Sequence, residues 1–310
     1  MRTYCVLFTI LCLPAVSQQV TNYSTDLNGR RMADASVTTA TSGNATTRTE
    51  LTQSVNGRMV PLESVEERVI RDDANGRVVE RITRKFDPNG RPGMTEKQQI
   101  QEKKNADGSV SSTVDVFRSD LNGRFELMER VTTDANKSGN TTNANIHVER
   151  PTLNGTLEVV ERKTRVATED KTSAKSDTTT FRKDPSGRFV EMVRVVTEAA
   201  DQNGQRTENT AQYEAADMGK LTLSQQSVAR VKKNADGTET REVDVYRNVP
   251  GRVVQSATPP LLERQIIEQR KSGEQLVETT VVQRPSINDP NRLGAPMKIG
   301  ERVCAGKDCK

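Results

Sequence analysis

The sequence predicts an all-β protein, a repetitive antiparallel β-meander, on three observations. Apolar and polar residues alternate with a period of two along most segments. Turns that contain glycine recur at a typical step of about 16 residues, and no helical segment of roughly 10–15 residues lies between them. We therefore expect about 16 hairpin-linked strands in one long twisted sheet. A β-propeller-like fold built from four-strand units is the alternative.

The first 17 residues have the pattern of a secretory signal peptide. Arg2 supplies the positive start, residues 4–16 form a short apolar core, and small residues at 15 and 17 suit a signal peptidase. The apolar run of about 13 residues is shorter than the roughly 20 that a spanning helix needs. No later segment is as apolar. We therefore expect a secreted chain, extracellular, on the cell surface or in the periplasm, with no integral membrane segment after signal cleavage.

Residues 18–52 form a Thr/Ser-rich N-terminal segment, for which we expect early strands or partial disorder. The chain as a whole is poor in core-forming residues, because aromatics make up 3% and the hydrophobic fraction is 33%. Charged residues make up 28%, but basic and acidic residues are interspersed. This mixture predicts solvated faces and disfavours a nucleic-acid partner, which would need a basic stripe.

Residues 53–284 form the predicted β-repeat domain, and their turns share one formula. The stretch "FDPNGR" at 86–91 has close variants at 72–77, 119–124 and 183–188. Asp at the first turn position accepts a backbone N–H and Gly takes a positive φ, so the formula predicts a type I turn closed by a glycine bulge. The expected turn residues are Asn28, Gly29, Asn75, Gly76, Asn89, Gly90, Asp107, Gly108, Asn122, Gly123, Gly187, Asp236 and Gly237.

A longer period of about 64 residues is superimposed on these turns. The pairs Phe117-Arg118, Phe181-Arg182 and Tyr246-Arg247 each precede a turn, at spacings of 64 and 65 residues. Residues 103–117 also match 232–246 closely. The period predicts a four-strand unit repeated about three and a half times. Because neither face of many strands is continuously apolar, we expect cross-strand pairs to supply much of the stability, at roughly 0.2–1 kcal/mol each.

The stretches "FDPNGR", "FRSDLNGR" and "YSTDLNGR" resemble the YD repeats of the Rhs and teneurin families, whose pattern is approximately Tyr-Asp-x-x-Gly-Arg. Phe86-Asp87 is the pair nearest to Tyr-Asp in this chain. In those families the repeats wind a β-sheet into a large shell. The resemblance covers several of the turns and implies an extracytoplasmic β-repeat protein, and no toxin or catalytic role is carried over from it.

Residues 285–310 contain three prolines and three glycines and are expected to form an irregular C-terminal tail. The two cysteines outside the signal peptide, Cys304 and Cys309, lie in this tail. A disulfide between them is expected in an exported protein, and free thiols or a metal are the alternatives. Zinc would need about four ligands, and the one histidine, His147, is far away in sequence.

The sequence indicates no catalytic residues, no cofactor site and no metal site. His147 is the one histidine available for a catalytic triad, and it is expected on a strand. Calcium is disfavoured in the D-x-N-G turns because Arg71, Lys85 and Arg118 occupy the first ligand position. An adhesive role for the NGR and SGR turns stays open, although alternate turns of a meander lie on opposite edges.

The expected function is a secreted, non-enzymatic structural or adhesive β-repeat protein of the cell envelope or surface. Its partner would be an envelope polymer, an envelope protein or a second copy of the chain, because open sheet edges favour self-association. The alternative is a periplasmic or extracellular glycan- or protein-binding module with a propeller-like fold.

Overall fold

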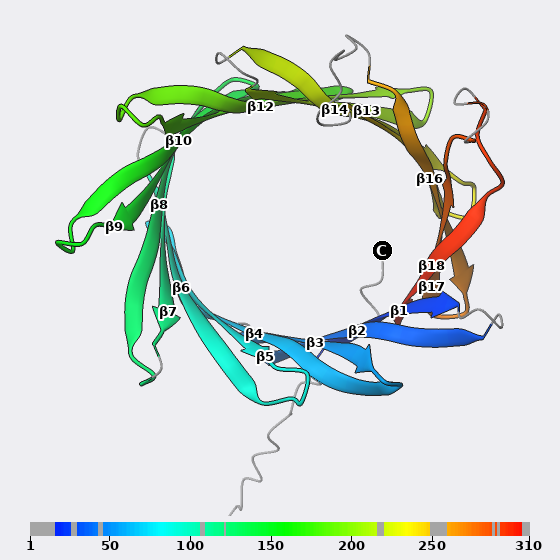
Figure 1. Cartoon of the computed structure of the whole chain (residues 1–310), viewed down its shortest axis with the longest axis horizontal. Coiled ribbons are helices and arrows are strands. Elements are labelled where there is room, and N and C mark those ends of the chain that lie inside the picture. Colours follow the sequence, from blue (N-terminus) through cyan, green and yellow to red (C-terminus); the bar gives the residue numbers. More distant parts are fainter. Residues whose placement is uncertain are drawn as a thin grey trace, which may run out of the picture.

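Antiparallel strands follow one another along the chain in the computed structural model (Figure 1). The structure describes residues 16–25, 30–42, 46–105, 109–120, 122–215, 220–248, 259–286, 289 and 292–305. Within these residues, 18 strands form one sheet in which sequence neighbours pair. The prediction of an antiparallel meander is confirmed, with 18 strands in place of the expected 16 or so.

The strands are β1 (Val16–Thr25), β2 (Arg31–Ser42), β3 (Thr46–Val55), β4 (Arg58–Asp73), β5 (Gly76–Phe86), β6 (Pro92–Lys104), β7 (Val110–Ser119), β8 (Phe125–Ser138), β9 (Thr141–Pro151), β10 (Leu157–Glu169), β11 (Ser173–Lys183), β12 (Phe189–Gln202), β13 (Gln205–Ala215), β14 (Leu221–Lys233), β15 (Glu239–Arg247), β16 (Leu261–Ser272), β17 (Gln275–Gln283) and β18 (Met297–Ala305).

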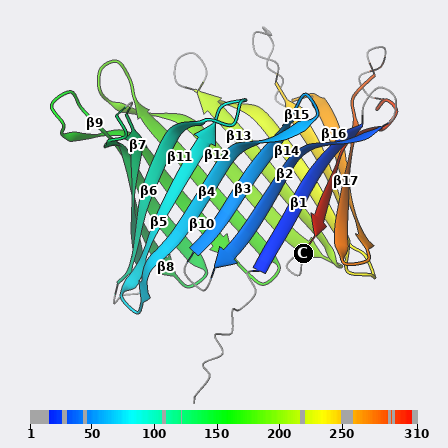
Figure 2. The same cartoon turned by 90° about the horizontal axis from the view of Figure 1, so that it is seen from below.

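The first and last strands pair with each other and close the sheet into a barrel. Gln19 lies opposite Ala305 and Tyr23 opposite Glu301 across the seam between β1 and β18. Figure 1 shows the resulting ring, and Figure 2 shows strands tilted against its axis. The expected long open sheet and the alternative of separate propeller sheets are both replaced by one closed wall. Twist accumulates from strand to strand, and closure pairs two edges that an open sheet would leave unpaired.

The barrel wall is a single layer. Each strand makes its main contacts with its two neighbours in the sheet. The chain exposes 22039 Å² of surface at a mass of 34.3 kDa, against roughly 13,000 Å² for a compact monomer of that mass. Neither face of the wall is therefore covered by a second layer of the chain, and we expect cross-strand pairs to carry much of the stability.

The pairing register sorts the side chains onto two faces of the wall. Residues directly opposite each other share a face, so Ala144 lies on one face with its partners Ala135 and Arg165. Asp244 and its partner Arg264 lie on the other. We call these the Ala144 face and the Asp244 face. Most of the buried apolar side chains lie on the Ala144 face: Val79, Ala144, Val148, Ala199, Ala229, Val282 and Cys304.

The two ends of the barrel are distinguished by their turns. Turns that follow odd-numbered strands lie at one end, which we call the odd-turn end and which forms the upper edge in Figure 2. Turns that follow even-numbered strands lie at the even-turn end. A β-bulge recurs near the odd-turn end in even-numbered strands, with the extra residue at Met128, Val160 and Met192. Bulges increase local twist and bend a strand, so their recurrence contributes to closure of the barrel.

The D-x-x-G-R turns share one hydrogen-bond pattern. The Asp87 carboxylate accepts the N–H groups of Asn89 (2.9 Å) and Arg91 (2.8 Å), and the N–H of Gly90 bonds to the Asp87 carbonyl at 2.8 Å. The turns that begin at Asp120 and Asp184 repeat the pattern. Positive φ angles occur at the expected glycines Gly76, Gly90, Gly123, Gly187 and Gly237, while Asn28, Gly29, Asp107 and Gly108 lie outside the described residues.

Among the described glycines, Gly76 leaves the least room for a side chain. Its φ is 148°, and a Cβ there would lie 2.0 Å from the carbonyl oxygen of Glu102 in the neighbouring strand. We expect Gly76→Ala to lower the free energy of unfolding by about 1–3 kcal/mol, measured by urea denaturation. Gly93→Ala is the control, because the added Cβ meets only an ordinary contact at 3.4 Å. Equal losses in both variants would contradict the prediction.

The two terminal segments differ in part from expectation. Residues 1–15 of the predicted signal peptide lie outside the described residues, and β1 begins at Val16. The tail predicted to be irregular contains the strand β18. The prolines of the tail precede this strand and Gly300 lies within it, so composition alone did not indicate a strand. Cys304 is buried in β18 and accepts a hydrogen bond from Gln18 at 3.2 Å. Cys309 lies outside the described residues, so the disulfide stays a prediction.

Candidate functional site

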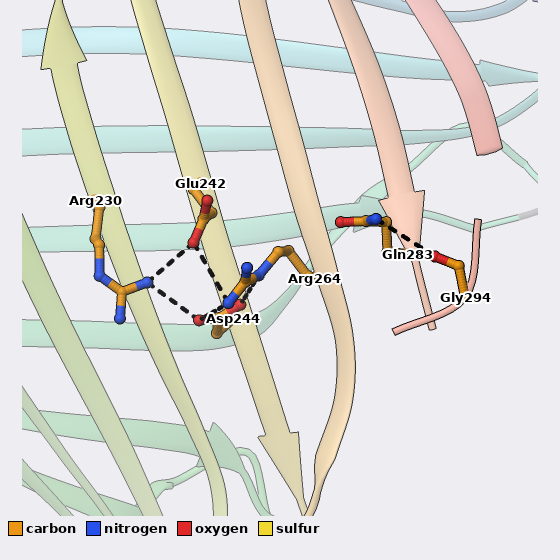
Figure 3. Close-up of polar contacts among 6 residues, drawn as sticks. All are labelled: Arg230, Glu242, Asp244, Arg264, Gln283 and Gly294. Atoms are coloured by element: carbon orange, nitrogen blue, oxygen red, sulfur yellow. Dashed lines mark hydrogen bonds and ion pairs between the residues drawn. The ribbon is translucent and has the colours of Figure 1, made fainter. Parts of the chain in front are cut away.

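The most buried charged side chain that the structure describes is Asp244, in the middle of β15, which is 1% exposed. Arg264 from β16 donates two hydrogen bonds to it, from Nε to Oδ1 at 2.6 Å and from Nη2 to Oδ2 at 3.0 Å. Arg230 from β14 donates to Oδ2 at 3.1 Å and also to Glu242 at 3.1 Å. Figure 3 shows this network across three strands, beside the hydrogen bond from Gln283 to Gly294.

The charges of this network are fixed by its hydrogen bonds. Burial alone would raise the pKa of Asp244, but the hydrogen bonds from Arg264 and Arg230 outweigh it and the pKa is lowered. The hydrogen bond to Asp244 raises the pKa of Arg264. The Asp244 carboxylate is therefore held in its ionised form by Arg264 and Arg230. The network ties β14, β15 and β16 together.

Acid should weaken the barrel through this carboxylate. The pKa of Asp244 is lower in the folded chain than in the unfolded chain, so its stabilisation is present above the unfolded pKa and is lost as pH falls through the folded pKa. We expect the free energy of unfolding to fall below about pH 4, and to fall less in the Asp244→Asn chain. Urea unfolding at stepped pH measures both curves. Parallel curves for the two chains would contradict this assignment.

Cross-strand ion pairs recur on both faces of the wall. On the Asp244 face, Arg130 binds Asp115 through two hydrogen bonds of 2.6 and 2.8 Å, and Arg194 binds Asp177 at 2.6 Å. On the Ala144 face, pairs of Glu with Arg repeat between neighbouring strands near the odd-turn end. These pairs are Glu96–Arg118, Glu129–Arg150, Glu161–Arg182 and Glu263–Arg284.

Aromatic residues gather at the odd-turn end. Every Phe and Tyr of the described strands lies on the Asp244 face, within three residues of a strand end there; we call this set the aromatic collar. Arg31 stacks over Tyr23 with 3.7 Å to the ring centroid, and Arg162 stacks over Phe189 at 4.2 Å. The collar consists of Tyr23, Phe86, Phe117, Phe125, Phe181, Phe189, Tyr213 and Tyr246.

Arginines of the repeated turns gather at the same end. A meander places alternate turns at opposite ends, and the G-R formula occurs mainly in every second turn. Arg58, Arg91, Arg124 and Arg188 therefore share the odd-turn end, whereas Arg77 lies at the even-turn end. The turn arginines and the aromatic residues can both be found in the sequence. Their shared position at one end follows only when every strand is numbered, because the turns alternate between the two ends of the barrel.

The remaining sites considered from the sequence are not brought together into a reactive centre. His147 lies exposed on β9, opposite Thr132 and Arg162. Among the described residues, no three His, Cys, Asp or Glu side chains converge as a metal site. A hollow of about 490 Å³ on the Ala144 face is lined by two apolar side chains and by charged and amide side chains, among which Glu129 and Arg150 pair with each other.

The comparisons with known proteins include a distant structural match. No protein-family model and no curated protein matches the chain. A solved structure of a porin-like protein from Bacteroides uniformis aligns with 96% of this chain and 99% of its own, at 7% sequence identity and a TM-score of 0.22. Within the described residues, no helix has the length and apolar character to cross a membrane.

Proposed function

We propose that this protein is an exported, non-enzymatic β-barrel of the cell envelope that serves as a structural or adhesive surface. The observation that carries the proposal is the presence of ion pairs at mid-strand positions on both faces of a single-layer wall. Asp244 with its arginines and Asp115–Arg130 lie on one face, and Glu67–Arg81 lies on the other. Such a wall is suited to water on both sides.

This charge distribution favours an aqueous envelope compartment over a position across a bilayer. A membrane-spanning barrel presents an apolar outer band about 25 Å tall, and each Arg or Lys at its midplane costs about 2–4 kcal/mol. Whichever face of this wall points outward, several charged strands would meet lipid. The signal pattern of residues 1–17 supports export.

The proposal of a non-enzymatic role rests on the chemistry of the charged groups. The buried carboxylate Asp244 is held ionised by two guanidinium groups, and the lining of the Ala144-face hollow pairs Glu with Arg. The alternative function is a one-site glycan- or protein-binding module. It would predict saturable one-to-one binding, whereas a repetitive surface predicts weak, multivalent binding.

Cell fractionation tests the proposal. We expect the mature chain to leave producing cells on osmotic shock or in high salt, without detergent. Protease treatment of intact cells then separates a surface location, where the chain is digested, from a location inside the envelope, where it is protected. Retention in membranes after an alkaline carbonate wash, with release by detergent alone, would overturn the proposal.

A further inference from the structure

Arginine side chains without an ion-pair partner among the described residues lie at three consecutive hairpins of the odd-turn end. Arg58 belongs to the β3–β4 hairpin, Arg91 to β5–β6 and Arg124 to β7–β8. All three side chains are exposed, and none forms an ion pair with any residue that the structure describes. Their charge is therefore available to a partner outside the barrel.

The acidic residues of the same turns bind backbone N–H groups and form no ion pair with these arginine side chains. Asp87 and Asp120 are half-buried, and each directs one carboxylate oxygen to two backbone N–H groups of its own turn. The guanidinium groups of Arg58, Arg91 and Arg124 are therefore available to an anionic partner at the odd-turn end.

The spacing of the tips suits a repeating partner. Neighbouring hairpins are offset by two strands, and strands lie about 4.8 Å apart. With the usual barrel tilt, adjacent arginine tips are separated by on the order of 10–13 Å along the rim, comparable to two or three sugar residues of an extended polysaccharide. A linear polymer with a regular charge would meet several tips in succession, and multivalency would raise its affinity.

The aromatic collar adds a second recognition element beside these tips. Phe125 directly follows Arg124 and is 44% exposed, and Phe86 closes the strand that leads to the Arg91 turn. Aromatic rings pack against the apolar C–H faces of sugar rings, while guanidinium groups bind carboxylate, sulfate or phosphate groups. The combination fits a charged sugar polymer better than a neutral one.

We propose that the odd-turn end binds a linear anionic polysaccharide, which follows the rim and pairs with Arg58, Arg91 and Arg124. The proposal rests on the proposed envelope function and names the class of polymer that the surface would hold. An anionic lipid surface fits less well. The polar tips, such as Asn89 and Asn122, lie beyond the collar and would enter the hydrocarbon before any aromatic ring reached it.

Binding of the purified full chain to polygalacturonate tests the proposal, with neutral dextran as the uncharged comparison. We expect Arg58→Gln, Arg91→Gln and Arg124→Gln, combined in one chain, to weaken binding about tenfold at low salt. The matched control combines Lys137→Gln, Lys171→Gln and Lys233→Gln, which are exposed cations next to turns at the even-turn end. We expect this control to retain the affinity of the unmodified chain.

The outcomes separate this proposal from the proposed function. Three outcomes would each overturn the polysaccharide proposal. The two triple variants could bind polygalacturonate with equal affinity, the chain could bind dextran as well as polygalacturonate, or it could bind vesicles with 30% phosphatidylglycerol and not polygalacturonate. Phe125→Ala should lower the affinity and leave its salt dependence unchanged, because it removes stacking and no charge. A chain released from cells without detergent that fails these binding tests would retain the proposed envelope function and lose only its proposed partner.

Discussion

Asp244→Asn is expected to lower the free energy of unfolding by about 1–3 kcal/mol, because it removes the buried anion that accepts hydrogen bonds from two guanidinium groups. The change leaves two guanidinium groups, those of Arg230 and Arg264, around a neutral amide that accepts fewer hydrogen bonds. Glu242 still pairs with both guanidinium groups, so the loss comes from the hydrogen bonds that the buried carboxylate accepted. Urea denaturation at neutral pH, followed by circular dichroism, measures the loss.

Asp177→Asn is the matched control on the same face of the wall. Asp177 pairs with one arginine, Arg194, and the side chains are 27% and 47% exposed. Water replaces such a partner readily, so we expect a loss of about 1 kcal/mol or less. Losses of equal size at the two positions would show that burial of Asp244 does not set the strength of the network.

A disulfide across the seam between β1 and β18 is expected to stabilise the barrel by about 5 kcal/mol. Thr21 lies directly opposite Val303, on the face that does not carry Cys304. In the chain with Thr21→Cys and Val303→Cys, the bond would close nearly the whole chain into a loop and restrict the unfolded state. The difference in denaturation midpoint between oxidised and reduced protein measures the effect.

The same substitution distinguishes a closed barrel from an open sheet. In an open meander the two residues would lie at opposite edges, and no intramolecular bond would form. The control chain carries Thr21→Cys and Thr132→Cys, since Thr132 lies on β8 and pairs with β7 and β9. Cross-linking in both chains, or in neither, would contradict the seam. Peptide mapping without reduction identifies which cysteines have paired.

The sequence was sufficient to predict the meander because its causes are local. Alternation along residues 110–134 and the Asp120-to-Gly123 turn specify the β7–β8 hairpin without distant contacts. Closure depends on the pairing of β1 with β18, which are separated by almost the entire chain. Alternation alone does not determine that pairing, because accumulated twist and the number of strands decide whether the edges meet.

The candidate site was visible only in part for a similar reason. Asp115, Asp177 and Asp244 occupy comparable places on polar strands, and nothing local indicates that only Asp244 is fully buried. Its burial requires arginines on both neighbouring strands, whereas each of the other two has an arginine partner on one side. The aromatic collar could likewise be predicted only if the end of the barrel at which each turn lies were known.

The seam between β1 and β18 also determines which strand pairing forms last during folding. A chain that crosses a membrane N-terminus first would deliver β1 early, yet one edge of β1 finds its partner only when β18 arrives. Intermediate hairpins form from local contacts, but the final pairing has a very long sequence separation and is expected to be slow. Until then the free edge is open to pairing with other chains. Misfolding of this barrel is therefore most expected just before β1 pairs with β18, when nearly every other strand is already paired.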